Sequence, residues 1–377
     1  MTEETVRPDG GSRACRRVRV EGCERNKQLV GIVGYGAYIP KNRIKTEAIA
    51  QAWAQDYAKI TASLAVHEKA VASYDQDTVT LAVQAAENAL VRADIAPEIV
   101  GALYIGSESH PYAVKPSATI IGTALGCSRD YLAVDMEFAC KGGTAALQAA
   151  YGLIASNLVQ YALAIGSDVA QAAPGDILEY TAAAGAAGFI MSANNQEFLA
   201  TIDATLSVSS DTPDFWRRSL QQYPEHVGRF TGEPSYFAHT CEAAEKIMAK
   251  TGSTQQDFDH VIFHQPNGKF PMQAGKKLGF SHKQLELGLI SPDIGNSYSA
   301  TALLGLTCVL DRAEAGQKIL LVSYGSGSGS DAFVMTTTSL LQKRQHSAKK
   351  TSEYIHDKKY IGYAQYRQIY QAREGIR

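Results

Sequence analysis

The strongest constraint in this 377-residue chain is that one order of elements occurs twice. Each copy has a helix, a strand, a polar loop, a second helix, a turn, a third helix and a further strand. Glu108 precedes Cys140 by 32 positions, and His264 precedes Asn296 by the same 32 positions. Glu108 and His264 therefore fall at matching strand ends, and Cys140 and Asn296 at matching helix starts. The repeat predicts two similar halves, which can bring all four polar groups to one site if they pack about a pseudo-two-fold axis.

The pattern divides the chain into four segments. Alternating strands and helices predict an α/β protein in which helices pack on sheets. The polar residues 201–234 predict a long irregular segment, which inside a compact protein is usually functional or a linker. An Arg-, Glu- and Gly-rich start without apolar periodicity predicts a disordered leader. The expected segments are a leader at 1–27, a first half at 28–200, a second half at 201–340 with an insertion at 201–234, and a tail helix at 341–377.

The central motif is a short apolar strand, a sharp turn at Cys140 and an Ala-rich helix. A thiol at a helix start lies near unpaired backbone N–H groups and the positive end of the helix dipole. This environment is expected to lower the thiol pKa and to make the thiolate available as a nucleophile. Cysteines are also common as buried structural residues, so the nucleophile interpretation depends on the matching half of the chain.

The four residues that the repeat aligns suit acyl chemistry. Cys140 beside His264 is an activated-nucleophile pair, and Asn296 can donate a hydrogen bond to a bound carbonyl or orient the imidazole. Glu108 adds a base that can take a proton from carbon next to a thioester, which cysteine proteases do not need. The glycine loop 325–329 offers backbone N–H groups to an enolate oxygen. A strand is expected after this loop, which argues against a phosphate-binding loop.

Composition argues against several classes of protein. The net charge of −2 gives no sign of a nucleic-acid or membrane-surface partner. No apolar run is long enough to span a bilayer, and the polar first residues lack a signal-peptide core. The 6 cysteines are scattered, without a Cys-x-x-Cys pair, so neither a metal site nor a disulfide framework is expected. A reduced, cytoplasmic enzyme is the simplest class.

Several motifs between about residue 29 and residue 340 together resemble one family. Gly-Ser-Glu-Ser-His-Pro contains Glu108, and Glu-Phe-Ala-Cys-Lys-Gly-Gly-Thr contains Cys140. The chain resembles the condensing enzymes of the thiolase superfamily, and within it the 3-hydroxy-3-methylglutaryl-CoA synthases of the archaeal type. The other matching motifs are Pro-Gly-Asp-Ile-Leu-Glu-Tyr-Thr ending at Thr181, Gly-Arg-Phe-Thr-Gly-Glu-Pro around Thr231, Phe-His-Gln-Pro-Asn-Gly-Lys ending at Lys269, Gly-Asn-Ser-Tyr-Ser around Asn296, and Ser-Tyr-Gly-Ser-Gly-Ser-Gly around Ser326.

This resemblance implies a fold and an activity. The fold is a duplicated, thiolase-like one, with a mixed five-stranded sheet in each half and αβαβα layers. The activity is condensation of acetyl-CoA with acetoacetyl-CoA, for isoprenoid synthesis through mevalonate, without metal or cofactor beyond the CoA thioesters. The implied roles are acyl-accepting nucleophile for Cys140, base at the acetyl methyl for Glu108, acid/base partner at the ketone for His264, carbonyl ligands for Asn296 and the Ser326 backbone, coenzyme A contact for Lys269, and pocket residues for Thr181 and Thr231.

The resemblance also implies partners, and it leaves alternatives open. The family's partners are a second copy of the chain and a larger complex with an acetoacetyl-CoA thiolase and a small bridging protein. One departure is that bacterial and animal relatives carry a pocket tyrosine where this chain has residues 171–173, Gln-Ala-Ala.

A ketoacyl-ACP synthase of the third kind is the alternative enzyme, but it has no need of Glu108. A non-catalytic assembly homologue is the alternative from another class. The Tyr/Lys-rich end is expected to fold back on its own subunit.

Overall fold

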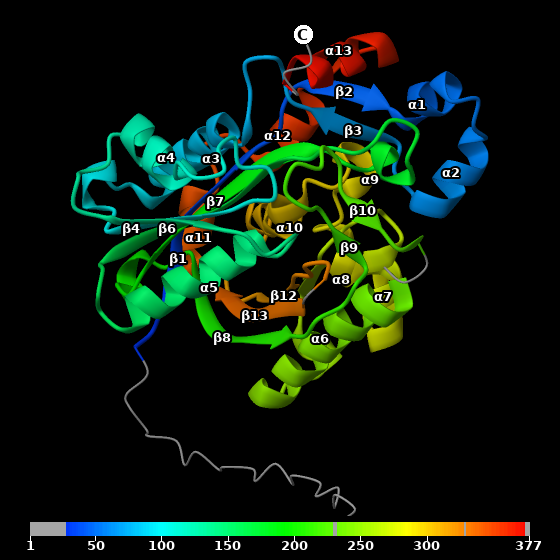
Figure 1. Ribbon diagram of the computed structural model, residues 1–377. Coiled ribbons are helices and arrows are strands. Elements are labelled where there is room, and N and C mark those ends of the chain that lie inside the picture. Colours follow the sequence, from blue (N-terminus) through cyan, green and yellow to red (C-terminus); the bar gives the residue numbers. More distant parts are fainter. Residues whose placement is uncertain (1–27, 229–231, 328, 374–377) are drawn as a thin grey trace, which may run out of the picture.

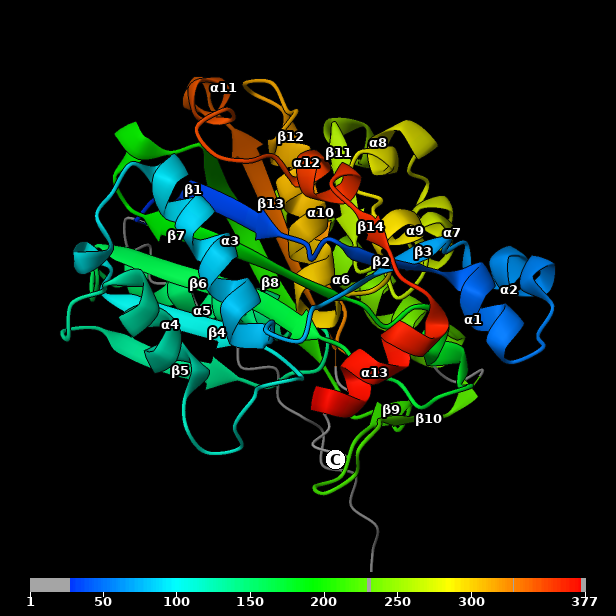
Figure 2. The ribbon, with the colours of Figure 1, turned by 90° about the horizontal axis from the view of Figure 1, so that it is seen from above.

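Nine strands form one mixed sheet that passes through both halves of the chain, in the order β11-β12-β13-β8-β1-β7-β6-β4-β5 (Figure 2). The computed structural model describes residues 28–228, 232–327 and 329–373. The predicted leader therefore lies outside the described residues. The strands of this sheet are β1 (Gly31–Tyr38), β4 (Ala102–Gly106), β5 (Leu132–Met136), β6 (Tyr161–Val169), β7 (Ala184–Ser192), β8 (Ala200–Ser209), β11 (His260–Phe263), β12 (Lys318–Val322) and β13 (Gly329–Thr337).

The strand order confirms the duplication that the sequence predicts. In the first half β4 runs parallel to β6, and β7 runs antiparallel to both β6 and β1. In the second half β11 runs parallel to β12, and β13 runs antiparallel to both β12 and β8. The two halves join where β1 pairs with β8 through only two residue pairs, Gly31 with Thr201 and Ile32 with Ala200.

The second half contributes four strands to this sheet among the described residues, not the five that were expected. The counterpart of β5 is the segment 287–290, between two short helices. Its backbone is bonded elsewhere: the Gln265 amide donates to the Gly288 carbonyl oxygen and accepts from the N–H groups of Ile290 and Ser291. The side chain of Gln265 thus makes the hydrogen bonds to this backbone that a neighbouring strand would otherwise make.

The helices lie in three layers around the two parts of the sheet (Figure 1). One apolar cluster contains α5 and α10 together with strands of both halves, so these two helices form the central layer. Separate clusters bury α3 and α4 on the outside of the first half, and α6 and α7 on the outside of the second. The helices are α1 (Thr46–Ala52), α2 (Tyr57–Leu64), α3 (Thr78–Ala93), α4 (Ser117–Leu125), α5 (Gly142–Ala155), α6 (Ala238–Thr251), α7 (Phe270–Leu278), α8 (His282–Glu286), α9 (Ser291–Ile294), α10 (Thr301–Leu310), α11 (Ser339–Arg344), α12 (Thr351–His356) and α13 (Tyr363–Arg373).

The segment 201–234 is less irregular than the sequence analysis predicted. Its first residues belong to β8, in which buried Ile202, Ala204 and Val208 alternate with more exposed polar residues. This alternation with period two is typical of a strand. It is complete from Ala200 to Ser209, with apolar residues on one face and Thr, Asp and Ser on the other, so the sequence pattern was sufficient to predict this strand. The following residues contain a short hairpin of β9 (Phe215–Trp216) and β10 (Glu225–His226).

The tail folds back on the chain, as predicted, but it is not a single helix. The helices α11, α12 and α13 are separated by loops and by β14 (Lys359–Tyr360), which pairs with β2 (Asn42–Lys45) beside β3 (Glu68–Val71). In α13 the rings of Tyr366 and Tyr370 are buried. The Tyr370 hydroxyl donates to the carbonyl oxygen of Ala170, 2.8 Å away, at the end of β6. Pairing of β14 with β2 separates α12 from α13. None of the described helices is both long and apolar enough to cross a membrane.

Helix α5 begins against the end of β4, and a glycine makes this approach possible. A Cβ atom added to Gly106 would lie 1.9 Å from the carbonyl carbon of Gly142. We expect Gly106→Ala to lower the free energy of unfolding by about 1–3 kcal/mol, because the helix must move away from the strand. The control is Gly152→Ala in the same helix, where an added Cβ meets nothing within 4 Å.

That control should raise the free energy of unfolding by about 0.5–1 kcal/mol, because alanine favours a helix interior over glycine. Denaturant midpoints of the two variants measure both effects. An unchanged midpoint for Gly106→Ala would contradict the close contact.

Candidate active site

Cys140 lies at the apex of a tight turn between β5 and α5. Ala139 has a φ of +43°, in the left-handed region that costs energy for a residue with a side chain. The N–H groups of Lys141 and Gly142 donate to the carbonyl oxygens of Phe138 and Ala139, each at 3.1 Å. The Cys140 side chain is buried in a small apolar cluster with Ala170, Ala172, Ala182 and Tyr298.

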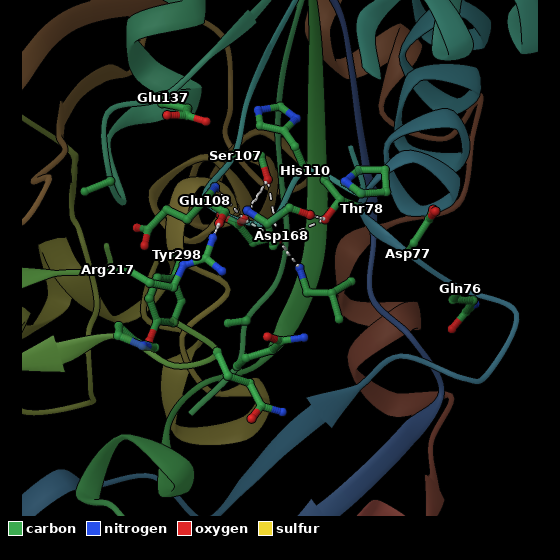
Figure 3. A pocket seen from close by; sticks show the side chains of 18 of the residues that line it. Gln76, Asp77, Thr78, Ser107, Glu108, His110, Glu137, Asp168, Arg217 and Tyr298 are labelled. Carbon is green, nitrogen blue, oxygen red and sulfur yellow. Dashed lines mark hydrogen bonds between the residues drawn. The ribbon is translucent and has the colours of Figure 1, made fainter. Parts of the chain in front are cut away.

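Glu108 follows β4 and contacts Cys140 directly. The Cys140 thiol donates a hydrogen bond to the Glu108 carboxyl group. The Glu108 backbone carbonyl accepts a hydrogen bond from Arg217, 3.1 Å away (Figure 3). Burial, and then the negative charge of Asp168, raise the pKa of Glu108 to about 8. The two functional residues predicted for the first half are therefore brought together.

The prediction of a lowered thiol pKa is wrong. Burial raises the pKa of Cys140 well above its usual value, and the Glu108 carboxylate raises it further. Helix α5 begins only at Gly142, so the carboxyl group in contact has more effect on the thiol than the helix dipole does. At rest Cys140 is a thiol, and its proton and that of Glu108 titrate as a pair.

Asp168, at the end of β6, is a site residue that the sequence analysis missed. Its carboxylate is fully buried and accepts hydrogen bonds of 2.6–2.9 Å from both halves of the chain (Figure 3). The donors are the hydroxyls of Ser107, Ser109 and Ser299 and the N–H groups of Glu108 and Ser299. Asp168 thus fixes the loop that carries Glu108 against the second half. Its place at a strand end was the one sequence signal that could have identified it.

His264 follows β11, as the repeat predicts, and its ring is buried. Burial lowers the pKa of His264 to about 3, so the imidazole is neutral at physiological pH. The ring lies 6.3 Å from that of Tyr324, and its Nδ1 has no hydrogen-bond partner among the described residues. In the part of the chain that the structure describes, no hydrogen bond joins His264 to Cys140. The imidazole therefore retains a free polar atom for a ligand.

Asn296 is held in one orientation next to the Cys140 cluster. Its side-chain oxygen accepts hydrogen bonds from the Tyr298 N–H at 2.9 Å and the Thr301 hydroxyl at 2.7 Å. Its backbone N–H donates to the carbonyl oxygen of Thr181 at 2.7 Å. The side-chain oxygen is therefore occupied, and the amide NH₂ group remains to donate to a ligand. The structure places Thr181 beside Asn296, as expected for two residues of one pocket.

The glycine loop of the second half lies against the Cys140 turn. A Cβ atom on Gly325 would approach the Phe138 carbonyl oxygen to 2.6 Å and the Lys141 side chain to 2.8 Å. Gly325 and Gly329 exchange backbone hydrogen bonds, and the Gly327 N–H donates to Asp214 at 2.6 Å. Among the described residues no hydrogen bond is made by the Ser326 N–H, so this group is available to a ligand.

A buried ion pair connects the same turn to the second half. Lys141 lies 2.9 Å from Asp331 of β13, and both side chains are almost completely buried. The hydroxyls of Thr144, Ser207 and Ser323 complete this network. Removing one partner of such a pair leaves an uncompensated buried charge, so the pair fixes the turn in position. The sequence analysis did not identify it, because its two members are far apart in the chain.

The remaining predicted residues are less closely tied to this centre. Lys269 precedes α7 and is partly exposed, and its N–H donates to the Asn267 side chain at 2.9 Å. Thr231 lies outside the described residues. Within the described ranges, no group of three or more His, Cys, Asp or Glu side chains could hold a metal ion. The arrangement offers a thiol, a carboxyl group of raised pKa, a neutral imidazole and an oriented amide, which together suit acyl transfer and proton transfer at carbon.

Comparisons with known proteins agree with this chemistry. The family model described as hydroxymethylglutaryl-coenzyme A synthase N terminal matches residues 26–195. The model described as 3-oxoacyl-[acyl-carrier-protein] synthase III C terminal matches residues 248–337. A hydroxymethylglutaryl-CoA synthase of Methanocaldococcus jannaschii is 55% identical over 90% of this chain and 97% of its own length. The corresponding enzyme of Archaeoglobus fulgidus is 52% identical over the same shares.

Solved structures show the same fold. MvaS in complex with 3-hydroxy-3-methylglutaryl coenzyme A has a TM-score of 0.80 and 26% identity, over 92% of each chain. A 3-oxoacyl-(acyl carrier protein) synthase III from Pseudomonas aeruginosa has a TM-score of 0.75 and 20% identity, over 82% of this chain and 98% of its own. The second likeness concerns the fold alone.

Proposed function

This chain belongs to the hydroxymethylglutaryl-CoA synthase family and is an acyl-condensing enzyme, and we propose that it carries an acetyl group on Cys140 while it joins acetyl-CoA to acetoacetyl-CoA. The product is 3-hydroxy-3-methylglutaryl-CoA, a precursor of mevalonate and isoprenoids. The observation that carries this assignment of roles is the contact between the Cys140 thiol and a Glu108 carboxyl group whose pKa is about 8. A thiol can accept the acetyl group, and such a carboxylate can then take a proton from its methyl group.

In the proposed mechanism the Cys140 sulfur attacks the acetyl-CoA carbonyl, the carbon–sulfur bond to CoA breaks, and the departing CoA takes up the proton of the Cys140 thiol. Glu108 then removes a methyl proton, while the Ser326 N–H stabilises the enolate oxygen. The enolate carbon attacks the ketone of acetoacetyl-CoA, and the new alkoxide takes up a proton from His264. His264 regains a proton from solvent, and Glu108 releases the methyl proton to solvent, so both groups return to their starting states. Asn296 holds a substrate carbonyl through its free NH₂ group, Thr181 and Thr231 line the pocket, and Lys269 binds coenzyme A. These steps need no metal or cofactor, because the substrates themselves carry the thioesters.

The two alternatives are less well supported. The synthase III model matches only residues 248–337, whereas the hydroxymethylglutaryl-CoA synthases match most of the chain. A decarboxylating synthase has no use for a base positioned as Glu108 is. A non-catalytic homologue has no need of the buried thiol, carboxyl group and imidazole. The proposal is tested by incubating the protein with acetyl-CoA and acetoacetyl-CoA and identifying the products by mass spectrometry. Formation of acetoacetyl-ACP from malonyl-ACP instead would contradict it.

The pH dependence of condensation should report the ionisation of Glu108. Because the pKa of Glu108 is raised to about 8, only about one-tenth of this group is the carboxylate base at pH 7. We expect kcat/KM for condensation to rise between pH 6 and 9, since the base form accumulates as the pH increases through the pKa. His264 adds no change in this range, because its pKa of about 3 keeps it neutral. A rate that falls from pH 6 to 9 would contradict these roles.

We also propose that the protein is a homodimer. Strand β5 lies at the outer edge of the sheet (Figure 2), and an unpaired edge strand can pair with another chain. Leu132 on this strand is 47% exposed, and Tyr112 and Val114, just before α4, are 52% and 93% exposed. We expect light scattering at micromolar concentration to give twice the 40.6 kDa of one chain. The variant Val114→Asp should weaken the dimer, and a monomeric parent chain would contradict the proposal.

A cytoplasmic location and a larger assembly complete the proposal. The four cysteines of the described residues are free thiols, which fits a reducing compartment. The assembly with an acetoacetyl-CoA thiolase and a small bridging protein is supported by resemblance to archaeal-type enzymes. Absence of a thiolase when the protein is purified from its native extract would count against it.

A further inference from the structure

A cavity of about 700 Å³ opens beside Glu108, and none of the described residues proposed above to bind substrate lines it (Figure 3). Its inner end is formed by buried Ser107 and Asp168 together with Glu108 and Tyr298. Its outer end contains side chains that are well exposed, Tyr74 at 57% and Trp216 at 36%. The cavity therefore connects the surroundings of the Cys140 thiol to the protein surface.

The charge of this cavity does not suit the coenzyme A part of a substrate. Its lining includes the carboxyl groups of Asp75, Asp77, Glu108, Glu137 and Asp168, and among the described lining residues only Arg217 carries a guanidinium or ammonium group. Phosphate groups would be repelled by such an excess of acids. Of the described residues, those that line the cavity include neither Lys269 nor His264. The cavity is therefore a second approach to the site, separate from the side that Lys269 marks.

Two buried polar atoms point to water as the ligand of the cavity. Glu108 Oε1 and His110 Nε2 are buried, and neither has a hydrogen-bond partner among the described residues. Both residues line the cavity, and the His110 side chain is only 8% exposed. His110 is held by its other ring nitrogen, Nδ1, which lies 2.9 Å from the Ser117 hydroxyl. Buried polar atoms are normally paired, and a roomy polar cavity lets water pair them.

The proposed reaction needs a water molecule at this place. The product has a free carboxyl group made from the acetyl carbon that Cys140 carried. The thioester bond to Cys140 must therefore be hydrolysed, while the CoA part of the bound product still occupies its own side of the site. We propose that the cavity beside Glu108 is the route by which water reaches the Cys140 thioester, and that His110 positions this water. The inference rests on the proposed function.

The step balances without any other reactant. The water oxygen forms a bond to the thioester carbon, and one water proton goes to the Glu108 carboxylate. The carbon–sulfur bond then breaks, and the Cys140 thiolate takes up a proton from Glu108. The result is a carboxylic acid, which ionises, and the Cys140 thiol in its original state.

This route is tested by replacing Gln171 with a larger residue whose side chain fills the cavity. Gln171 lines the cavity and is half-buried. Acetyl-CoA is used to acetylate Cys140, excess reagent is removed, and loss of the acetyl group to water is followed by intact-protein mass spectrometry. We expect Gln171→Trp to acetylate normally but to lose the acetyl group at least about tenfold more slowly than the parent. The matched control Gln171→Ala leaves the cavity open and should lose it as fast as the parent.

A second variant tests His110 with less change in volume. His110→Asn keeps an amide close to the Ser117 hydroxyl but removes the Nε2 atom, so deacetylation should slow while acetylation persists. Equal deacetylation rates in Gln171→Trp and the parent would overturn the water route, and unchanged deacetylation in His110→Asn would overturn the role of His110. Failure of Gln171→Trp to acetylate would place the thioester itself in this cavity and would also overturn the route. A parent chain that cannot be acetylated at all contradicts the proposed function instead.

Discussion

Cys140→Ser is expected to abolish acetylation and to lower condensation by several orders of magnitude. The serine hydroxyl is a far weaker nucleophile than a thiol because it ionises much less readily, and the neutral imidazole of His264 is not bonded to residue 140. Mass spectrometry of the digested protein after incubation with acetyl-CoA should show one acetyl group on the Cys140 peptide of the parent and none in the variant.

A second cysteine provides the control for this experiment. Cys127 is also a free thiol, partly buried, and follows α4. Cys127→Ser should acetylate at Cys140 and condense like the parent, because this residue is not part of the Cys140 cluster. Acetylation of any other cysteine in the parent would contradict the assignment of the nucleophile.

The duplication was predictable because it appears in the sequence as a repeated local pattern. Each half repeats the same periodicity, and the fixed separation of 32 residues aligned Glu108 with His264 and Cys140 with Asn296. The structure confirms that Glu108 and His264 follow strands, whereas α5 begins two residues after Cys140 and α10 begins five residues after Asn296, so the two helix starts are only approximately matched. The period-two pattern of β8 was present in the sequence and was not recognised. The hydrogen bonds from Gln265 to residues 288–291, which take the place of a fifth strand in the second half, are visible only in the fold.

The parts of the site that could not be predicted depend on contacts between distant residues. Asp168 accepts hydrogen bonds from Ser107 and from Ser299, and Lys141 pairs with Asp331, so neither arrangement can be read from spacing. The direction of the thiol pKa was wrong for the same reason. A helix start is visible in the sequence and lowers a thiol pKa, whereas burial and a contacting carboxylate are visible only in the fold.

The second large effect is expected for Glu108→Ala, because Glu108 takes the proton from the methyl group of the acetyl-enzyme in the proposed mechanism. In an addition of acetyl-enzyme to acetoacetyl-CoA the methyl group must be deprotonated, and no decarboxylation supplies the carbanion. A general base contributes typically about 10²–10⁴-fold in rate, so condensation should fall by that factor. Exchange of the acetyl methyl hydrogens with deuterated solvent should fall with it.

Acetylation, in contrast, should survive in Glu108→Ala. The Glu108 carboxyl group raises the pKa of the Cys140 thiol, so its removal makes the thiolate easier to form. The control is Glu98→Ala, which removes an exposed carboxylate from the short helix at Pro97–Ile99 and should leave both steps unchanged. Acetylation is measured by intact mass and condensation by product formation from the pre-acetylated protein. If condensation by acetylated Glu108→Ala stays within a few-fold of the parent, Glu108 is not the base, and the carbanion must arise in another way.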